Sequence, residues 1–381
     1  MDGYHLSEGV SPMIIICNKG DLLKAVGTVS KAVSVRTTMP ILEDILLDGE
    51  GTTLTLLGND LEMGIQTSIE AVVRAEGSVA VNARMFSEII RRLPDEDVKI
   101  ETTDDNHMTI ECARSKFTIG TLPGKDFPKL PEIKKELEIM VNQAVLRDMI
   151  TNTLFSVAPE NSGRPVLTGE LFDVRDGYLY VVAVDGFRIS AKRAKVQCSQ
   201  NFKVTIPGKA LSEINKILES EEDSIATIVF TGKHAMFSMN QTIVLTRLLE
   251  GTFLNYERNL EMEFQTKIKV NRKELLDSVD RAALISRESK NNPIRLEIDE
   301  EKILITSNAE TGTAREEVEC SMEKGEGLTI AFNPKYYMDA LKAASDDEIV
   351  INYSSSLTPC IIEGTENSDY KYFILPIRLH N

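Results

Sequence analysis

The residues of this chain whose types and spacing could do chemistry are lysines and arginines placed seven positions apart. Residues seven apart lie on one face of a helix, so each pair would form a basic stripe. Such a stripe attracts the phosphates of a polyanion without reading bases. For any single pair, an ordinary solvated helix face is the alternative, whereas repetition at equal offsets favours a binding surface. The pairs are Lys24/Lys31, Arg84/Arg91, Lys209/Lys216 and Lys335/Lys342.

Catalytic and metal-binding patterns are missing from the sequence. There is no phosphate loop, no GxGxxG, no HExxH and no GxSxG. Paired carboxylates such as Glu221/Glu222 stand in polar turns, where exposure to solvent is expected. The 4 histidines and 5 cysteines are scattered without the spacing of a zinc site. The sequence therefore predicts no cofactor, no metal and no catalysis, although an enzyme with an unrecognised site remains an alternative.

Length and composition predict an ordinary globular protein. The chain has 381 residues, of which 42% are hydrophobic and 27% charged, and this length suits two or three domains. No apolar run approaches the ~18 residues that a membrane span needs. An odd number of unpaired cysteines is typical of reduced thiols, which predicts a cytoplasmic protein without a membrane partner. Residues 1–12 lack the features of a signal peptide and are predicted to be a flexible leader, with a later start of the chain or a non-native segment as the alternatives.

The negative net charge of the chain is not evenly distributed along the sequence. A net charge of −16 argues at first against a nucleic-acid partner. Six windows with a helical pattern nevertheless carry a net +6, which leaves −22 for the rest of the chain. The windows are 19–33, 82–93, 142–156, 207–218, 271–285 and 333–344. The helices are therefore the basic part of an otherwise acidic protein, as a surface for a polyanion would require.

The chain repeats one unit six times. Each unit opens with a β-rich run that ends in Asn, or once in Pro, before an amphipathic pattern. The openings are 14–18 (IIICN), 79–82 (VAVN), 139–142 (IMVN), 204–207 (VTIP), 268–271 (IKVN) and 330–333 (IAFN). Asn suits the helix N-cap. A large apolar residue follows four positions later and predicts the buried helix face: Leu22, Phe86, Leu146, Leu211, Leu275 and Tyr337.

The sequence between these predicted helices consists of strand-like and hairpin-like segments. Each unit therefore reads as a strand, a helix and about three antiparallel strands. We predict an α+β fold of six β-α-β-β-β units, two to a domain, with domains at 13–133, 137–263 and 264–381.

The whole of 13–381 resembles the bacterial DNA polymerase III beta sliding clamp family. Beside the repeats, the resemblance rests on residues 36–42 (RTTMPIL), 58–62 (GNDLE), 122–128 (LPGKDFP), 183–188 (AVDGFR) and 375–379 (LPIRL). It implies three repeated clamp-fold domains in a head-to-tail dimeric ring, with the helices lining the inside and the antiparallel sheets outside. The implied function is that of a processivity factor, which encircles duplex DNA, tethers the polymerase and catalyses no reaction.

Simple geometry agrees with a ring of two chains. Helices packed ~8–10 Å apart, twelve in number, would enclose a hole of about 25 Å. Six helices from one chain would leave well under ~10 Å, too little for a duplex. If the helices line a ring, two copies are required.

The resemblance also implies functional residues. Arg36 and Lys209 are expected DNA contacts, and the stripes add Lys24, Lys31, Arg84, Arg91, Lys216, Lys335 and Lys342. The expected partner-peptide pocket comprises Leu167, Val184, Gly186, Phe187, Arg188, Ile189, Leu254, Arg258, Asn259, Leu375, Pro376, Ile377 and Arg378. Its apolar members would form a wall, and its arginines would bind peptide carbonyls or carboxylates. Plain core packing is the alternative for Leu167 and Ile189.

Three pocket positions depart from the family pattern. Leu254, Phe187 and Asn259 stand where proline, histidine and an aliphatic residue are common, which affects the shape of the pocket and its peptide preference but not its location.

The dimer is expected to join the strand of Phe117 and Ile119 to the partner's third domain near Leu284 and Ile285. The implied partners are double-stranded DNA held without sequence preference, a second copy of the chain, the clamp loader, and replicative and repair polymerases or other proteins with short clamp-binding peptides. A monomeric repeat scaffold that binds only proteins is the remaining alternative.

Overall fold

The computed structural model describes residues 12–34, 37–103, 105–198, 200–221, 223–286, 292–366 and 368–378. Six times along the described chain a strand leads into a helix, and at least three antiparallel strands follow. The six openings are β1 (Ile14–Asn18) with α1 (Lys19–Val29), β6 (Gly77–Asn82) with α2 (Ala83–Arg92), β11 (Leu137–Asn142) with α3 (Gln143–Thr151), β15 (Phe202–Pro207) with α4 (Gly208–Asn215), β19 (Thr266–Asn271) with α6 (Arg272–Ser286), and β23 (Leu328–Phe332) with α7 (Pro334–Ala343). The predicted β-α-β-β-β repeat is confirmed.

Asparagine side chains cap the first turns of helices α1, α2, α6 and α7. Asn18 Oδ1 accepts a hydrogen bond from the backbone N–H of Gly20 at 2.8 Å. Asn82, Asn271 and Asn333 accept equivalent bonds from the first turns of α2, α6 and α7 at 3.1, 3.0 and 2.9 Å. Each bond satisfies a donor that has no partner inside the helix, which is why an Asn at the end of a strand starts the next helix.

The predicted apolar position of each helix lies in the core. Four residues after each opening, the side chains of Leu22, Phe86, Leu146, Leu211, Leu275 and Tyr337 are all 0% exposed. Each helix therefore packs on its sheet through one stripe.

The described residues fall into two compact units. One comprises the residues up to Gln143 together with Lys216–Arg247, and the other comprises Ala144–Asn215 together with the residues from Leu248 onward. The middle domain expected from the sequence, 137–263, contributes strands to both units.

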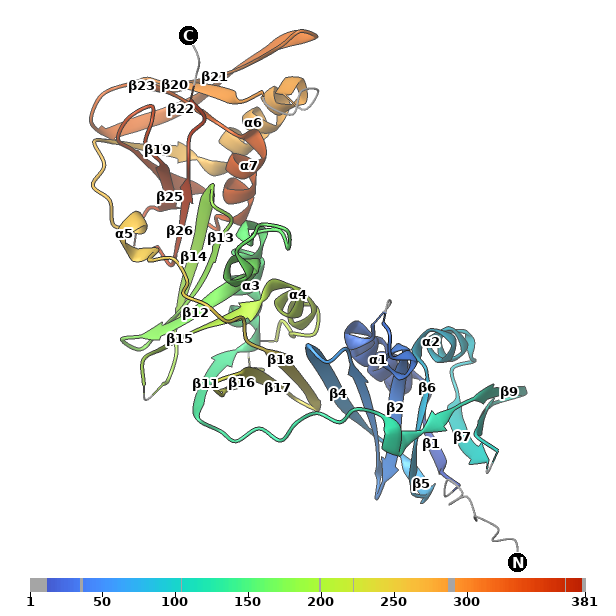
Figure 1. Cartoon of the computed structure of the whole chain (residues 1–381). Helices are drawn as coiled ribbons and strands as arrows, with labels where there is room; N and C mark the ends of the chain where they lie inside the picture. The colour runs from blue at the N-terminus through green and yellow to red at the C-terminus, as the bar shows by residue number, and fades with distance from the viewer. Residues whose placement is uncertain are drawn as a thin grey trace, which may run out of the picture. The chain divides into compact units, whose positions relative to one another are not determined.

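Two sheets build the first unit (Figure 1). The smaller has the order β5 (Val72–Ala75), β1, β7 (Asp97–Thr103), β8 (His107–Cys112) and β9 (Ser115–Gly120). The larger has the order β10 (Leu122–Pro123), β6, β2 (Asp44–Glu50), β3 (Thr53–Asn59), β4 (Met63–Glu70), β18 (Thr242–Arg247), β17 (His234–Met239), β16 (Ile225–Phe230) and β11. All the strand pairs are antiparallel, and β4 joins β18 through the register Ile65↔Val244.

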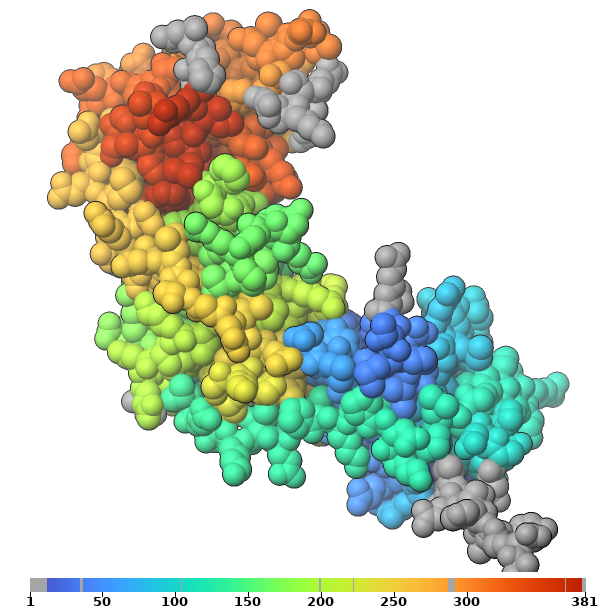
Figure 2. Space-filling view, in the orientation of Figure 1, coloured from blue at the N-terminus to red at the C-terminus, as the bar shows by residue number. Residues whose placement is uncertain are grey.

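A single sheet of 12 strands runs through the second unit. Its order is β15, β12 (Gly169–Arg175), β13 (Tyr178–Val184), β14 (Arg188–Lys195), β26 (Tyr370–Ile374), β25 (Cys360–Gly364), β24 (Glu348–Tyr353), β19, β22 (Gly312–Lys324), β21 (Lys302–Ala309), β20 (Ile294–Ile298) and β23. The pairing of β14 with β26, in the register Arg188↔Ile374, brings segments far apart in sequence side by side (Figures 1 and 2).

Short helices complete the connections. The four-residue α5 (Glu257–Leu260) precedes β19, and single 3-10 turns lie at Ser30–Ala32, Pro40–Glu43, Gly124–Asp126, Leu154–Ser156 and Pro165–Thr168. All 5 cysteines are free thiols, and all but Cys198 lie in strands.

Candidate functional site

The basic residues that the sequence singled out lie mostly on exposed helix surface. Lys24 on α1, Arg84 and Arg91 on α2, Lys209 on α4, and Lys335 and Lys342 on α7 are all exposed. Within the described residues, the side chains of Lys24, Arg84, Lys335 and Lys342 form no ion pair. Arg91 does: it pairs with Glu88 one turn earlier, and Arg92 also reaches that carboxylate, at 2.8 Å.

Two of the four expected stripes do not run along a single α-helix. α1 ends at Val29, so Lys31 falls in the 3-10 turn Ser30–Ala32, is only partly exposed, and donates from Nζ to the Gly27 carbonyl at 3.0 Å. α4 ends at Asn215, so Lys216 lies just beyond it. The seven-residue spacing therefore describes a continuous helical face only on α2 and α7. Arg36 lies outside the described residues.

A cleft in the first unit nevertheless gathers three of these cations. It has a volume of about 460 Å³, and its lining includes Lys24, Lys31 and Lys216 with the polar side chains of Gln143 and Gln241. The acids Asp21 and Glu219 also line it. Positive charge from two repeats thus converges on one polar hollow, which suits an anionic group.

The expected pocket residues divide into a buried and an exposed set. Leu167, Val184 and Ile189 are 8%, 3% and 3% exposed and belong to one apolar cluster with Tyr256 and Phe373. For Leu167 and Ile189, the core packing considered as an alternative is therefore what the structure shows. Phe187, Leu254 and Leu375 are instead 57%, 43% and 36% exposed. These three are the apolar side chains that a partner could contact.

The remaining pocket residues lie on α5 and in the segment after β26. Arg258 and Arg378 are exposed, and Asn259, Pro376 and Ile377 are partly exposed. The segment after β26 is fixed at two points, because the N–H of Leu375 donates to the Phe187 carbonyl at 2.9 Å and that of Ile377 donates to the Ala331 carbonyl at 2.8 Å. Leu375 is thereby held beside the loop that carries Phe187.

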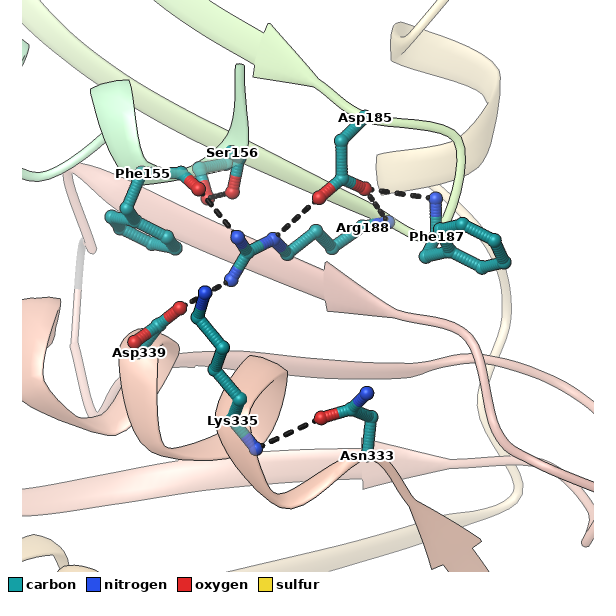
Figure 3. Close-up of polar contacts among 9 residues, drawn as sticks. Phe155, Ser156, Asp185, Phe187, Arg188, Asn333, Lys335 and Asp339 are labelled. Atoms are coloured by element: carbon teal, nitrogen blue, oxygen red, sulfur yellow. Dashed lines mark hydrogen bonds and ion pairs between the residues drawn. The ribbon is translucent and has the colours of Figure 1, made fainter. Parts of the chain in front are cut away.

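Asp185 and Gly186 shape that loop between β13 and β14. Asp185 Oδ1 accepts hydrogen bonds from the backbone N–H groups of Phe187 and Arg188 at 2.9 and 3.1 Å. Gly186 has a φ of +94°, in the left-handed region that favours glycine. The turn pushes the Phe187 side chain outward and returns the chain into β14 at Arg188 (Figure 3).

Arg188 is the most heavily bonded side chain of the loop (Figure 3). Its Nε donates to Asp185 Oδ2 at 2.8 Å, Nη1 donates to Asp339 Oδ2 on α7 at 2.7 Å, and Nη2 donates to the Phe155 carbonyl. Arg188 is only 6% exposed. This departs from the expectation that its guanidinium would bind peptide groups. A guanidinium with five donors can serve several buried acceptors at once, and here it ties together the loop, α7 and the 3-10 turn Leu154–Ser156.

Aromatic rings that the sequence reasoning missed enclose this guanidinium. It lies over the rings of Tyr336 and Phe155, 4.5 and 5.1 Å from their centroids. Tyr336 also stacks on Phe187 with ring centroids 5.9 Å apart. Burial and the nearby Asp185 carboxylate raise the pKa of Tyr336. The only sequence signal in this region was the helical pattern of α7. That pattern predicted burial for the neighbouring Tyr337 and made no prediction for Tyr336.

The residues expected at the dimer joint lie on two separate elements. On β9, Phe117 is 40% exposed, whereas Ile119 is 9% exposed and already packed within the chain. β9 is an edge of its sheet, bonded to β8. On α6, Leu284 is 58% exposed and Ile285 is partly exposed.

Comparison with known proteins identifies the family. Residues 13–131, 140–255 and 258–378 match the N-terminal, central and C-terminal domains of the DNA polymerase III beta subunit. The chain belongs to the DNA polymerase III beta subunit family. It is 34% identical over 360 residues to the beta sliding clamp of Staphylococcus epidermidis, which covers 92% of this chain and 95% of that protein. The beta sliding clamp of Staphylococcus aureus matches equally well.

Solved structures of the family have the same fold. The DNA polymerase sliding clamp of Bacillus subtilis aligns with a TM-score of 0.93 and 32% identity, covering 97% of this chain and all of that one. A putative beta subunit from Eubacterium rectale aligns with a TM-score of 0.92 and 37% identity over 96% of this chain and all of that one. A Pseudomonas aeruginosa clamp bound to griselimycin aligns with a TM-score of 0.90 and 29% identity over 96% of this chain and all of that one. The α+β clamp fold of three repeated domains is thus confirmed.

Two structural observations accompany the family assignment. Within the described ranges, no three His, Cys, Asp or Glu side chains come together so that they could hold a metal ion. No helix in those ranges combines the length and the apolar character needed to cross a membrane.

Proposed function

We propose that this chain is a bacterial DNA sliding clamp, the non-catalytic subunit that gives the replicative polymerase its processivity. The observation that carries the proposal is the full-length likeness to beta sliding clamps in a chain whose repeated helices display exposed cations. Lysines and arginines that meet phosphates hold a duplex without reading its sequence, and such contacts allow sliding. The acidic remainder of the chain would repel DNA elsewhere. The clamp would act in the bacterial cytoplasm, at the replication fork.

The proposed ring contains two copies joined head to tail. Among the described residues, β9 pairs only with β8, and residues 312–319 of β22 pair only with β21, so each leaves one edge open. Each copy has both edges, so β9 in the first unit of one chain can pair with β22 in the second unit of the other chain. Two such joints close a ring. The exposed Phe117 on β9 and Leu284 on α6 supply apolar surface for the joint. Twelve helices would then surround the duplex.

Partner proteins would dock through short peptides at the surface formed by Phe187, Leu254 and Leu375, with Tyr336 beside Phe187. Replicative and repair polymerases and the clamp loader are the proposed partners. The exposed Phe187 and Leu375 are linked by the hydrogen bond from the Leu375 N–H to the Phe187 carbonyl, which suits an apolar peptide anchor. The exposed Arg258 and Arg378 suit the carboxylates of such a peptide. The griselimycin complex of the Pseudomonas aeruginosa clamp supports a ligand site on this fold.

A topological experiment tests the proposal. The protein is loaded onto nicked circular DNA with a bacterial clamp loader, the complex is isolated, and the circle is then cut once. Release upon linearisation is expected, because a ring can leave only over a free end. Retention on the linear DNA would mean ordinary surface binding and would contradict the proposal. A solution mass of one chain at micromolar concentration, in place of twice 42.4 kDa, would contradict the ring.

A further inference from the structure

Helix α7 borders both of the surfaces to which we assign a function. Lys335 and Lys342 are exposed on it and belong to the proposed DNA contacts. On the same helix, Tyr336 stacks on Phe187 of the proposed peptide pocket. Asp339 forms the ion pair with Arg188 of the same loop (Figure 3). One helix of ten residues therefore carries groups of both sites.

Asp339 is placed where its charge affects the two lysines. It follows Lys335 by four residues and precedes Lys342 by three, and residues with these spacings are neighbours on a helix surface. The Asp339 side chain is 23% exposed, so its field reaches solvent with incomplete screening. While Arg188 pairs with it, that negative charge is offset. If the pair opened, an uncompensated carboxylate would stand between two cations that are to meet phosphates.

Arg188 also fixes the part of the loop that a peptide would contact. Its bond to Asp185 closes the turn that presents Phe187, and its position over Tyr336 keeps that ring beside Phe187. Opening the pair between Arg188 and Asp339 would remove the ion pair that holds the loop to α7 and leave only the contacts with the Tyr336 ring. The paired arrangement is therefore the one with a preformed aromatic surface for the peptide.

We propose that the Arg188–Asp339 ion pair couples the two sites, so that DNA binding and peptide binding strengthen each other. The proposal rests on the proposed function. DNA favours the paired state because phosphates near α7 disfavour a free Asp339 carboxylate. A peptide favours the same state because it packs on the loop that Arg188 holds. Two ligands that prefer one state of a protein bind with positive cooperativity, and the coupling is reciprocal.

The test measures the affinity of full-length protein for fluorescently labelled griselimycin, without and with a saturating short DNA duplex at low salt. We expect the duplex to tighten griselimycin binding about fivefold. Asp339→Asn removes the carboxylate, and the increase is then expected to fall below about twofold. Asp277→Asn is the matched control: it makes the same charge change on α6, where Asp277 is exposed and pairs with Lys273 at 2.7 Å. The control is expected to keep the full increase.

A second variant keeps the test valid if Asp339→Asn folds poorly. The double substitution Lys335→Gln with Lys342→Gln alters only exposed side chains, and it should also abolish the increase, because α7 no longer attracts phosphates. Equal griselimycin affinity with and without duplex in the wild type would overturn the coupling alone. An undiminished increase in both variants would overturn it as well. Failure to bind both griselimycin and duplex would contradict the proposed function itself, and the coupling with it.

Discussion

Two groups of arginines in this molecule have opposite environments. Arg84 and Arg91 on α2 are exposed to solvent. Among the described residues, Arg84 forms no ion pair and Arg91 forms only the surface contact with Glu88. Arg188 is 6% exposed and has protein acceptors at Nε, Nη1 and Nη2. A guanidinium of the first kind is available to an outside anion at little cost. A buried guanidinium such as that of Arg188 stabilises the fold through its bonds. It is not available to a ligand, because a ligand would have to replace those bonds.

The largest expected difference between the two groups concerns stability. Removing the Arg188 guanidinium takes away the donor to Asp185 Oδ2, to the half-buried Asp339 carboxylate and to the Phe155 carbonyl. Breaking a buried ion pair from one side costs about 3–5 kcal/mol, so Arg188→Ala should lower the free energy of unfolding by that amount. Arg84→Ala, the exposed control, should change it by less than about 0.5 kcal/mol. Chemical denaturation of both variants measures the difference, and equal effects would mean that the Arg188 network is not stabilising.

A buried acid without a cation provides the next contrast. Glu170 on β12 is 0% exposed, Oε1 accepts a hydrogen bond from Thr153 at 2.7 Å, and Oε2 has no partner among the described residues. Burial raises the pKa of Glu170 to about 8. The folded protein thus holds a proton that the unfolded chain releases near pH 4.5, so folding is penalised increasingly as the pH rises through that interval.

Glu170→Gln should remove this penalty. We expect the variant to match the wild type at about pH 4.5 and to become more stable above it, by up to about 1.4 kcal/mol for each pH unit until about pH 8. Thermal unfolding midpoints of both proteins across that range provide the measurement, with exposed Glu160→Gln as the control. A stability difference that does not change with pH would show that Glu170 is ionised in the folded protein.

The sequence could predict the environment of a charged group only where local sequence determines it. The six openings were predictable because Asn at the end of a strand and a large apolar residue four positions later act locally, through one cap bond and one helix face. The exposure of Arg84 and Arg91 was predictable for the same reason. The partners of Arg188 were not, because Asp339 lies 151 positions away and meets it only through the packing of β14, β26 and α7.

The same distinction holds among the pocket residues. Leu167 and Phe187 were both named from the family resemblance, yet one is packed in the core and the other lies outside it. Tyr336 escaped notice because its stacking on Phe187 is also a long-range contact. The seven-residue spacing of the lysines did not predict that α1 and α4 end before Lys31 and Lys216. Helix ends depend on tertiary packing as well as on local sequence.

The exposed group should dominate the response of DNA binding to salt. The double substitution Arg84→Gln with Arg91→Gln removes two proposed phosphate contacts. The slope of log affinity against log salt concentration should therefore fall in magnitude by about 2. A matched pair of exposed cations on strands β20 and β21, Arg295→Gln with Lys302→Gln, should leave the slope unchanged. Duplex binding by fluorescence polarisation at several salt concentrations measures both, and identical slopes in the two double variants would remove α2 from the DNA-contacting surface.

The smallest expected effect on DNA binding concerns the ion pairs of the exposed arginines on α2. Glu88 engages both Arg91 and Arg92, whereas Arg84 has no ion pair among the described residues. Exposed pairs of this kind contribute about 0–1 kcal/mol, so Glu88→Gln should leave stability almost unchanged. It should, however, release two cations toward phosphate and tighten duplex binding about two- to threefold at low salt. Glu101→Gln removes the same charge from strand β7, where Glu101 pairs with Lys99. If both substitutions tightened binding equally, net charge alone would account for the gain, whereas a gain confined to Glu88→Gln would place the phosphates beside α2.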